Sequence, residues 1–196
     1  MTIEIRILKG DELEAALPDL AKLRIKIFRD WPYLYDGTME YEQAYLSRYA
    51  QTEGAVIVGA YDGDTLVGAA TGEPLEQEVI QFRGPFEDKG LDPREIFYLA
   101  EALLDPAYRG QGIGHLFYDE REAHAKALGF STAAFCAVIR PDNHPLKPDN
   151  YSPLDDFWRK RGYDKLAGGI VHFPWQDVGE DGESEKPMQV WIRSLK

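Results

Sequence analysis

A glycine-rich segment, Arg109-Gly110-Gln111-Gly112-Ile113-Gly114, stands between an apolar stretch and an amphipathic one. The apolar stretch, Glu95–Leu104, predicts a buried strand, and the residues from Ile113 to Leu128 predict a helix. The first N–H groups of a helix have no partner within it, and the helix dipole favours negative charge there. Because glycines let a ligand approach the main chain closely, the spacing predicts a loop that binds a pyrophosphate.

Other phosphate-binding motifs fit the sequence poorly. A GxxxxGK[ST] loop is absent. A dinucleotide-binding GxGxxG motif would need a small residue at His115 and an acidic residue further on, where Ala133-Ala134-Phe135-Cys136 stands. What remains is an [R/Q]xxGx[G/A] pattern, for which a plain tight turn is the alternative interpretation.

Glu101 is a lone acidic residue within the apolar run Ile96–Leu104. A carboxylate in such a strand is costly unless it faces a wet cleft or a charged partner. Two interpretations follow: Glu101 is a general base, or it forms a structural ion pair with an arginine across the sheet. The sequence leaves both open.

The composition limits the class of protein. The chain has 196 residues, of which 44% are hydrophobic and 29% charged, and this predicts one soluble globular domain over residues 1–196. The net charge of −12 disfavours nucleic acid and anionic membranes as partners. No apolar run approaches the roughly 20 residues that span a bilayer, and the alternating Met1–Ile7 predicts a strand rather than a signal peptide.

The single cysteine, Cys136, lies inside a strand pattern and predicts a small core residue. One cysteine excludes an intrachain disulfide and is typical of a reducing compartment, so we expect a cytoplasmic protein. No His or Cys spacing predicts a metal site.

The periodicity predicts an α+β protein around one mixed sheet. The first helix runs from Asp11 to about Phe28, with a kink or a fresh start at Pro18, and Thr38 caps the second helix. A short helix is expected within residues 76–94, and residues 140–152 form a long loop. The expected inner face of helix 113–128 consists of Ile113, Leu116, Phe117, Ala123 and Ala127. The expected strands are residues 2–8, 55–61, 65–71, 95–104, 131–139, 165–175 and 188–193, and a further helix covers residues 154–161.

The glycine-rich segment, the Leu103-Leu104-Asp105-Pro106 before it and the later Phe157-Trp158-Arg159-Lys160-Arg161-Gly162-Tyr163 resemble the GNAT superfamily of acetyl-CoA-dependent N-acyltransferases. The order of elements is similar to that fold over nearly the whole chain. The resemblance implies a twisted mixed sheet of about seven strands flanked by about four helices. It also implies that strands Glu95–Leu104 and Ser131–Ile139 splay apart to admit the pantetheine arm of coenzyme A.

The resemblance further implies direct transfer of an acetyl group from acetyl-CoA to a small-molecule amine or an amino terminus, without a metal. The main chain of Arg109 through Gly114 would hold the pyrophosphate, with the Arg109 side chain as an extra cation. The main chain of Leu103 and Leu104 would pair with the pantetheine amides. Asn143 would lie near the pantetheine, and a homodimer through the C-terminal strands is a tendency of the family.

Glu101 is then the candidate base, as a direct proton acceptor or through water. The family often has a tyrosine as proton donor to the thiolate, at the position where this chain has Trp158. Tyr151 is the candidate replacement, and a thiolate that leaves without a donor is the alternative. Two rival functions also stay open: an acyl-CoA-binding sensor without turnover, and the transfer of a longer acyl group.

The resemblance also implies that the acceptor side is lined by the loop between the first two helices and by the hairpin of the last strands. The aromatic and charged residues of that loop suit a partly apolar small molecule that bears an amine. The alternative is that Trp31 and Tyr33 simply cap the core. The candidate acceptor-binding residues are Arg29, Asp30, Trp31, Tyr33 and Tyr35.

Overall fold

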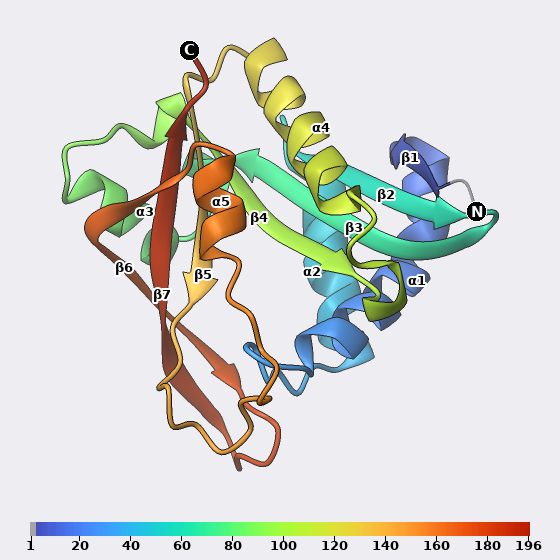
Figure 1. Cartoon of the computed structure of the whole chain (residues 1–196). Coiled ribbons are helices and arrows are strands. Elements are labelled where there is room, and N and C mark those ends of the chain that lie inside the picture. Colours follow the sequence, from blue (N-terminus) through green and yellow to red (C-terminus); the bar gives the residue numbers. More distant parts are fainter. Residues whose placement is uncertain (1–2) are drawn as a thin grey trace.

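The computed structural model describes residues 3–196 and contains a seven-stranded sheet with strand order β1-β2-β3-β4-β5-β7-β6 (Figure 1). Only the β4–β5 pair is parallel among these neighbours. The strands are β1 (Ile3–Ile7), β2 (Val56–Asp62), β3 (Thr65–Pro74), β4 (Ile96–Leu104), β5 (Thr132–Val138), β6 (Asp164–Gln176) and β7 (Glu183–Ser194). The helices are α1 (Gly10–Phe28), α2 (Met39–Gln51), α3 (Ile80–Glu87), α4 (Ile113–Ala127) and α5 (Asp155–Lys160). The predicted α+β class is confirmed.

Strands β4 and β5 pair over a short stretch and then separate. The pairing covers Ile96–Tyr98 against Thr132–Ala134 and stops there. Figure 1 shows β4 continuing toward the lower right while β5 runs straight down. This confirms the predicted splayed pair. Residues 99–104 of β4, which we call the free edge of β4, have no strand beside them on the β5 side within the described chain.

A β-bulge lies at the start of this free edge. In the β3–β4 pairing, Thr71 is opposite Glu101 and Glu73 is opposite Tyr98. Strand β3 has one residue between these positions and β4 has two, so the extra residue belongs to β4. Such a bulge bends the strand and redirects the side chains that follow it, here Glu101.

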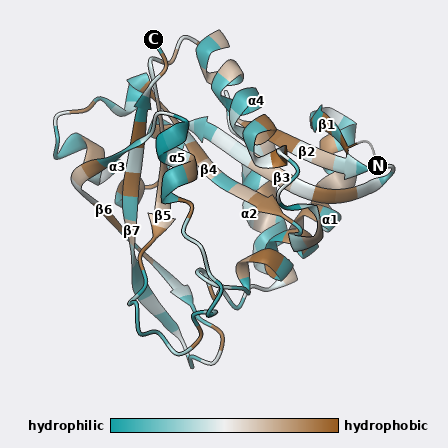
Figure 2. Cartoon of the chain, viewed as in Figure 1, coloured by the Kyte–Doolittle hydropathy of each residue, from teal (hydrophilic) through white to brown (hydrophobic). Residues whose placement is uncertain are grey.

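The helices cover both faces of the sheet. Helices α1 and α2 pack on one face, around a core that includes Leu20, Leu46 and Leu103. Helices α4 and α5 pack on the other, where Phe117 and Trp158 meet Phe135 and Trp191. Figure 2 shows α5 as largely hydrophilic on its outer side, with apolar stretches along the strands behind it. The point where β4 and β5 separate therefore lies between two packed layers of helices.

Helix α1 differs from the prediction. It runs without interruption from Gly10 to Phe28, so a fresh start at Pro18 is wrong. A proline inside a helix removes one main-chain hydrogen bond. The buried face with Leu13, Leu20 and Leu23 packs on both sides of Pro18 and compensates for that loss. Helix α2 begins as predicted, because the Thr38 side chain accepts a hydrogen bond from the Tyr41 amide at 3.3 Å.

The inner face of α4 was also predicted incorrectly in part. Ile113 and Phe117 are buried, but Leu116 is 43% exposed, and Ala123 and Ala127 are exposed. Buried polar side chains, Arg121 and Glu122, occupy the inner face instead. Both have partners there, so a pattern based on apolar residues alone misplaced the face. Helix α3 matches the short helix expected within residues 76–94. It brings the number of α-helices in the described residues to five, where the resemblance implies about four.

Candidate active site between β4 and β5

The segment 109–114, called the glycine loop here, joins β4 to α4. Gly110 and Gly112 have φ angles of +77° and +83°, which only glycine adopts without strain. A Cβ added at either position would meet no atom within 4 Å, so the outer side of the loop is open. Within residues 3–196, no acceptor contacts the amides of residues 110–114. These free donors at the start of α4 form an anion-binding arrangement.

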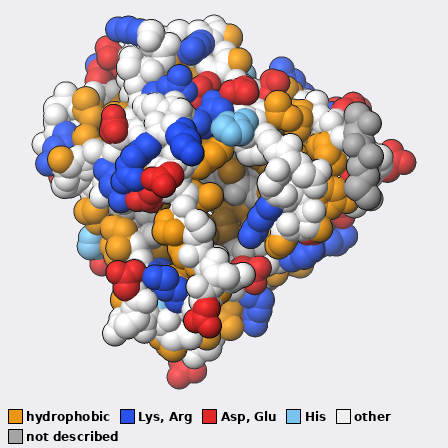
Figure 3. All heavy atoms as spheres, viewed as in Figure 1, with side chains coloured by type: hydrophobic (Ala, Val, Ile, Leu, Met, Phe, Trp, Pro, Cys, Tyr) orange, Lys and Arg blue, Asp and Glu red, His pale blue; other side chains and the backbone are white. Residues whose placement is uncertain are grey.

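Cationic side chains lie around the glycine loop. The Arg109 Nε donates to the Leu104 carbonyl at 3.4 Å. Arg161, at the end of α5, lies 3.2 Å from the His115 ring nitrogen Nδ1 and pairs with Asp119. Figure 3 shows blue and pale blue side chains above a hollow whose inner surface is hydrophobic. The surroundings therefore suit a ligand with a phosphate end and an apolar arm.

The free edge of β4 offers main-chain groups beside this hollow. The Asp105 amide donates to the Val67 carbonyl at 2.9 Å, and in an antiparallel pair such contacts fall on alternate residues. The register therefore turns the main-chain groups of Leu103 toward β3 and those of Ala102 and Leu104 toward the free edge. An extended arm with amides would find its partners at Ala102 and Leu104. Of the predicted pair, the main chain of Leu104 therefore faces the free edge and that of Leu103 faces β3.

Glu101 lies three residues beyond the last β4–β5 pair, and its side chain is 13% exposed. Its carboxylate forms an ion pair with Arg24 of α1, and Arg24 also pairs with Glu42 of α2. The sequence left an ion pair of Glu101 as one interpretation, and the structure contains one, with its partner on a helix rather than across the sheet. We call these three residues the Arg24 cluster. The role of Glu101 as a base stays a prediction.

The opposite face of the sheet supports the same point of β4. Arg121 of α4 is fully buried and donates to the carbonyls of Glu101 at 2.9 Å and Thr71 at 3.1 Å. Burial lowers the pKa of its guanidinium. These hydrogen bonds join β3 and β4 where the bulge interrupts their register, so they fix the main chain that carries the Glu101 side chain.

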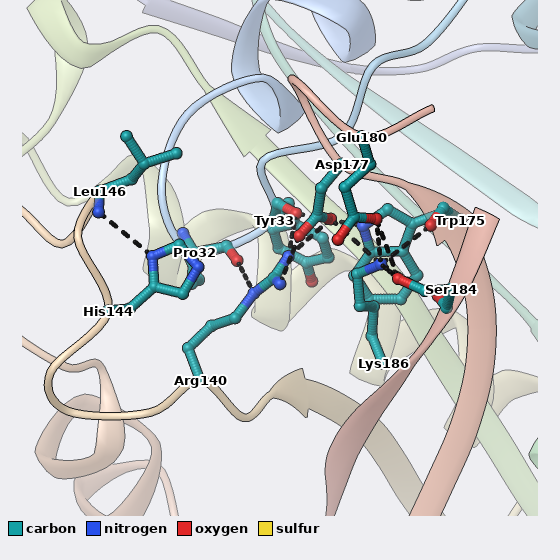
Figure 4. A network of polar contacts seen from close by, with 10 residues as sticks. All are labelled: Pro32, Tyr33, Arg140, His144, Leu146, Trp175, Asp177, Glu180, Ser184 and Lys186. Carbon is teal, nitrogen blue, oxygen red and sulfur yellow. Dashed lines mark hydrogen bonds and ion pairs between the residues drawn. The ribbon is translucent and has the colours of Figure 1, made fainter. Parts of the chain in front are cut away.

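The loop between α1 and α2, residues 29–37, is called the acceptor loop here. Figure 4 shows Arg140 reaching it from the segment that follows β5. Arg140 donates to the Pro32 carbonyl at 2.8 Å and to the Tyr33 carbonyl, and it forms two hydrogen bonds with Asp177. Lys186 of β7 lies 3.5 Å from the same Asp177 carboxylate. This Arg140 network ties the acceptor loop to the β6–β7 hairpin with side chains that are less than a tenth exposed.

The predicted acceptor residues lie in different surroundings. Trp31 packs against Tyr151 and His144 of the loop between β5 and α5, with ring centroids 5.9 and 5.0 Å away. Tyr33 packs on Phe28 and Trp175, so it does contribute to the core. Burial, the largest effect, raises the pKa of Tyr33 to about 12 and also raises that of Tyr151, so both hydroxyls hold their protons at neutral pH.

The charged members of the acceptor loop are partly neutralised by one another. Arg29 pairs with Asp36, and both are exposed. Asp30 is exposed, and its carbonyl accepts from the Leu34 amide. The main chain of Tyr35 forms a bridge to Asp177, and the Tyr35 ring faces Tyr41. Asn143 is exposed in the loop after β5. The structure thus brings Tyr33 and Tyr35 to the Arg140 network and leaves Arg29 and Asp30 at the rim.

A second buried pair of carboxylates lies on the α2 side of the sheet. Arg48 holds the Glu73 carboxylate at 2.8 Å and lies 3.8 Å from that of Glu78. Burial and a hydrogen bond with Glu73 raise the pKa of Glu78 to about 8. One arginine thus serves two buried acids here, as it does in the Arg24 cluster.

Trp158 and Cys136 have structural positions. The Trp158 ring packs between Phe135 and Trp191, with centroids 5.0 and 5.1 Å away. Cys136 is buried, and burial raises the pKa of its thiol to about 12, which makes it a poor nucleophile. Both side chains belong to the packed layers rather than to a reactive surface.

The sequence analysis did not predict a role at the site for Arg24, Glu42, Arg121 or the Arg140 network. A signal was present for Arg24, because it lies among Leu20, Leu23 and Ile27 on the apolar stripe of α1. A charged residue in such a stripe needs a buried partner, by the argument applied to Glu101. The Arg140 side chain contacts residues 37 or more positions away, and no local pattern indicates these contacts.

The structure offers no group of three potential metal-ligating side chains anywhere in residues 3–196. Over the same residues, no helix is long and apolar enough to cross a membrane.

Comparison with known proteins agrees with this geometry. Residues 20–148 match the model of the acetyltransferase (GNAT) family. The fold is similar to that of a ribosomal-protein-alanine N-acetyltransferase from Brucella melitensis, at 15% identity and a TM-score of 0.65, covering 97% of this chain and 99% of that one. No curated protein sequence matches the chain.

Two further similar structures were determined with ligands. One is yncA from Salmonella typhimurium with its cofactor acetyl-CoA, at 12% identity and a TM-score of 0.63, covering 100% of this chain and 95% of that one. The other is PaiA N-acetyltransferase from Thermoplasma acidophilum in complex with coenzyme A, at 16% identity and a TM-score of 0.56, covering 99% of each chain. The family match over most of the sequence, the splayed β4–β5 pair and the open glycine loop show that this chain belongs to the GNAT family of acetyltransferases.

Proposed function

We propose that this protein is an N-acetyltransferase that moves an acetyl group from acetyl-CoA to a primary amine of a small molecule or an amino terminus, by direct transfer. The observation that carries the proposal is that, in the part of the chain that the structure describes, unpaired main-chain groups follow one another from the free edge of β4 into the glycine loop. The free edge of β4 leads into the unpaired amides of residues 110–114, and Glu101 stands at the inner end of that edge. Acetyl-CoA supplies the activated acetyl group as a thioester.

The chain's own residues divide the work. The main chain of Ala102 and Leu104 would align the pantetheine arm, and the glycine loop with Arg109 would hold the pyrophosphate. The acceptor nitrogen forms a bond to the acetyl carbon while the carbon–sulfur bond breaks. The amine loses one proton, which Glu101 takes directly or through water, and the thiolate gains one. Asn143 stays a candidate contact of the arm.

The acceptor would enter from the side of the acceptor loop. Trp31, Tyr33 and Tyr35 offer aromatic surfaces there, and Asp30 and Arg29 offer charge at the rim. Tyr151 is the candidate proton donor to the thiolate, because its raised pKa keeps the hydroxyl protonated. A net charge of −12 favours the approach of cationic amines.

The test is thiol release from acetyl-CoA with a panel of polyamines, amino acids, aminoglycosides and short peptides. We expect Glu101→Gln to lower amine-dependent release by about 100-fold or more while calorimetry shows unchanged acetyl-CoA binding. Glu95→Gln is the matched control, because Glu95 is exposed just before β4. If the wild-type protein does not bind acetyl-CoA, the proposal is refuted.

One observation favours a second function, an acyl-CoA-binding module without turnover. Trp158 fills the position where the family often has a tyrosine, and its partly buried ring packs against the core. If acetyl-CoA binds but no acceptor releases thiol, even with longer acyl donors, this second function is the correct one.

A further inference from the structure

The Arg24 cluster links three elements at the inner end of the free edge of β4. Arg24 comes from α1, Glu42 from α2 and Glu101 from β4. The side chains are 6%, 0% and 13% exposed. The Glu101 side chain is therefore the most exposed of the three.

Packing leaves Arg24 little freedom to move. Its guanidinium lies 4.3 Å from the Tyr45 ring centroid and 5.1 Å from that of Phe28. Both rings belong to the walls that surround the cluster, so Arg24 is held by cation–π contacts as well as by its two ion pairs. Glutamate has three rotatable side-chain bonds, and a buried glutamate without a partner would be protonated. The ion pair with Arg24 restricts the rotation of the Glu101 side chain and favours its ionised form.

We propose that Arg24 is a positioning residue that fixes the Glu101 carboxylate beside the cleft and keeps it ionised, while Glu42 shares the charge of Arg24 and so preserves the basicity of Glu101. This inference rests on the proposed role of Glu101. With Arg24 alone beside it, Glu101 would be a weaker base. With Glu42 also present, two carboxylates share one guanidinium, so the cluster keeps one negative charge.

Other groups face the cluster and must be considered. Tyr45 faces it from α2, and the Tyr33 and Tyr35 hydroxyls approach from the acceptor loop. Burial first, and then the nearby Glu42 carboxylate, raise the pKa of Tyr35. All three tyrosines stay neutral in the range where carboxylates titrate. Arg121 contacts the main-chain carbonyl of Glu101 and not its carboxylate. Arg48, further along α2, pairs with Glu73 and Glu78 instead.

The test is the pH dependence of kcat/KM for the amine, measured with any acceptor that the panel identifies. Arg24→Met leaves two buried carboxylates without a cation, so we expect the acid limb to move up by about 1–3 pH units. Glu42→Gln leaves Arg24 to Glu101 alone, so the acid limb should move down. Arg24→Lys retains the charge and should stay close to the wild-type profile. Opposite shifts in the first two variants would not arise from general structural damage.

Lys22→Met is the matched control, because it removes an exposed positive charge from the same helix. Unchanged acid limbs in Arg24→Met and Glu42→Gln, or shifts in the same direction, would overturn the inference. If Arg24→Met does not fold, the downward shift in Glu42→Gln decides the question alone. Full activity of Glu101→Gln would instead refute the base itself, which distinguishes that failure from this one.

Discussion

The glycine loop takes its donors from five consecutive main-chain amides, whereas the acceptor side is assembled from side chains of separate segments. The loop needs only positive φ angles at Gly110 and Gly112 and a helix start at Ile113. The acceptor side needs Arg140, Asp177 and Lys186 to meet in space. A main-chain site therefore depends on local geometry, and a side-chain site depends on the whole fold.

The largest effect on acetyl-CoA binding should follow from disturbing the local geometry of the glycine loop. Gly112→Val places a β-branched residue at a φ of +83°, which costs roughly 1–2 kcal/mol and displaces the free amides. We expect the Kd of acetyl-CoA to rise by about tenfold or more, which corresponds to about 1.4 kcal/mol. Calorimetry measures it directly.

Gly90→Val is the matched control for this change. Gly90 has a φ of +72° and open space at its Cβ, but it lies in a turn after α3. It should lose similar stability and retain acetyl-CoA affinity. Equal losses of affinity in both variants would mean that backbone strain, rather than the loop's amides, causes the effect.

Arg140→Met should weaken binding of the amine and leave acetyl-CoA binding unchanged, which is the reverse of the effect expected for Gly112→Val. The substitution leaves the Pro32 and Tyr33 carbonyls without their donor and Asp177 with Lys186 alone. Since Lys186 still compensates Asp177, we expect a loss of about 3 kcal/mol, at the lower end for a broken buried pair. The KM for the amine should rise while the Kd of acetyl-CoA stays constant.

Urea unfolding and steady-state kinetics measure the two consequences of Arg140→Met. Arg94→Met, which removes an exposed arginine paired with Asp92, should change the free energy of unfolding by less than about 0.5 kcal/mol. A loss of acetyl-CoA affinity in Arg140→Met would show that the two sides of the cleft are not independent.

The smallest effect on ligand binding is expected at the second carboxylate pair, where a substitution should change only the stability. Glu78 has a pKa of about 8 in the folded protein against an ordinary 4.5, so the folded state binds more protons than the unfolded state between these values. The stabilising contribution of the protonated form is therefore lost as the pH rises through this window. The free energy of unfolding should fall with rising pH, and Glu78→Gln should remove this part of the slope.

Glu76→Gln is the control for Glu78→Gln, because Glu76 is exposed two residues earlier. Unfolding curves in urea at several pH values between 5 and 8 give both slopes. If Glu78→Gln retains the wild-type slope, Glu78 is ionised in the folded protein, and Arg48 neutralises the pair more fully than the geometry indicates.

Local signals predicted the elements, and they failed where a partner from another element decided the outcome. The Thr38 cap and the two neighbouring strands expected at residues 55–61 and 65–71 follow from their own residues and neighbours. Pro18 did not divide α1, because packing against α2 and β3 holds both halves of the helix. The inner face of α4 was misplaced because Arg121 finds its acceptors at Thr71 and Glu101, which lie 50 and 20 positions away.

The sequence alone determined the α+β order and the glycine loop, because each depends on periodicity and on residues that are adjacent in the chain. The splayed strands were an implication of the family resemblance. The sequence also singled out Glu101 as an acid that needed an explanation. Only the tertiary structure decided that Arg24 and Glu42 surround this acid, and that Arg140 joins the acceptor loop to the β6–β7 hairpin. The physical reason is burial: a charge inside the protein requires a partner, and folding determines which distant residue provides it.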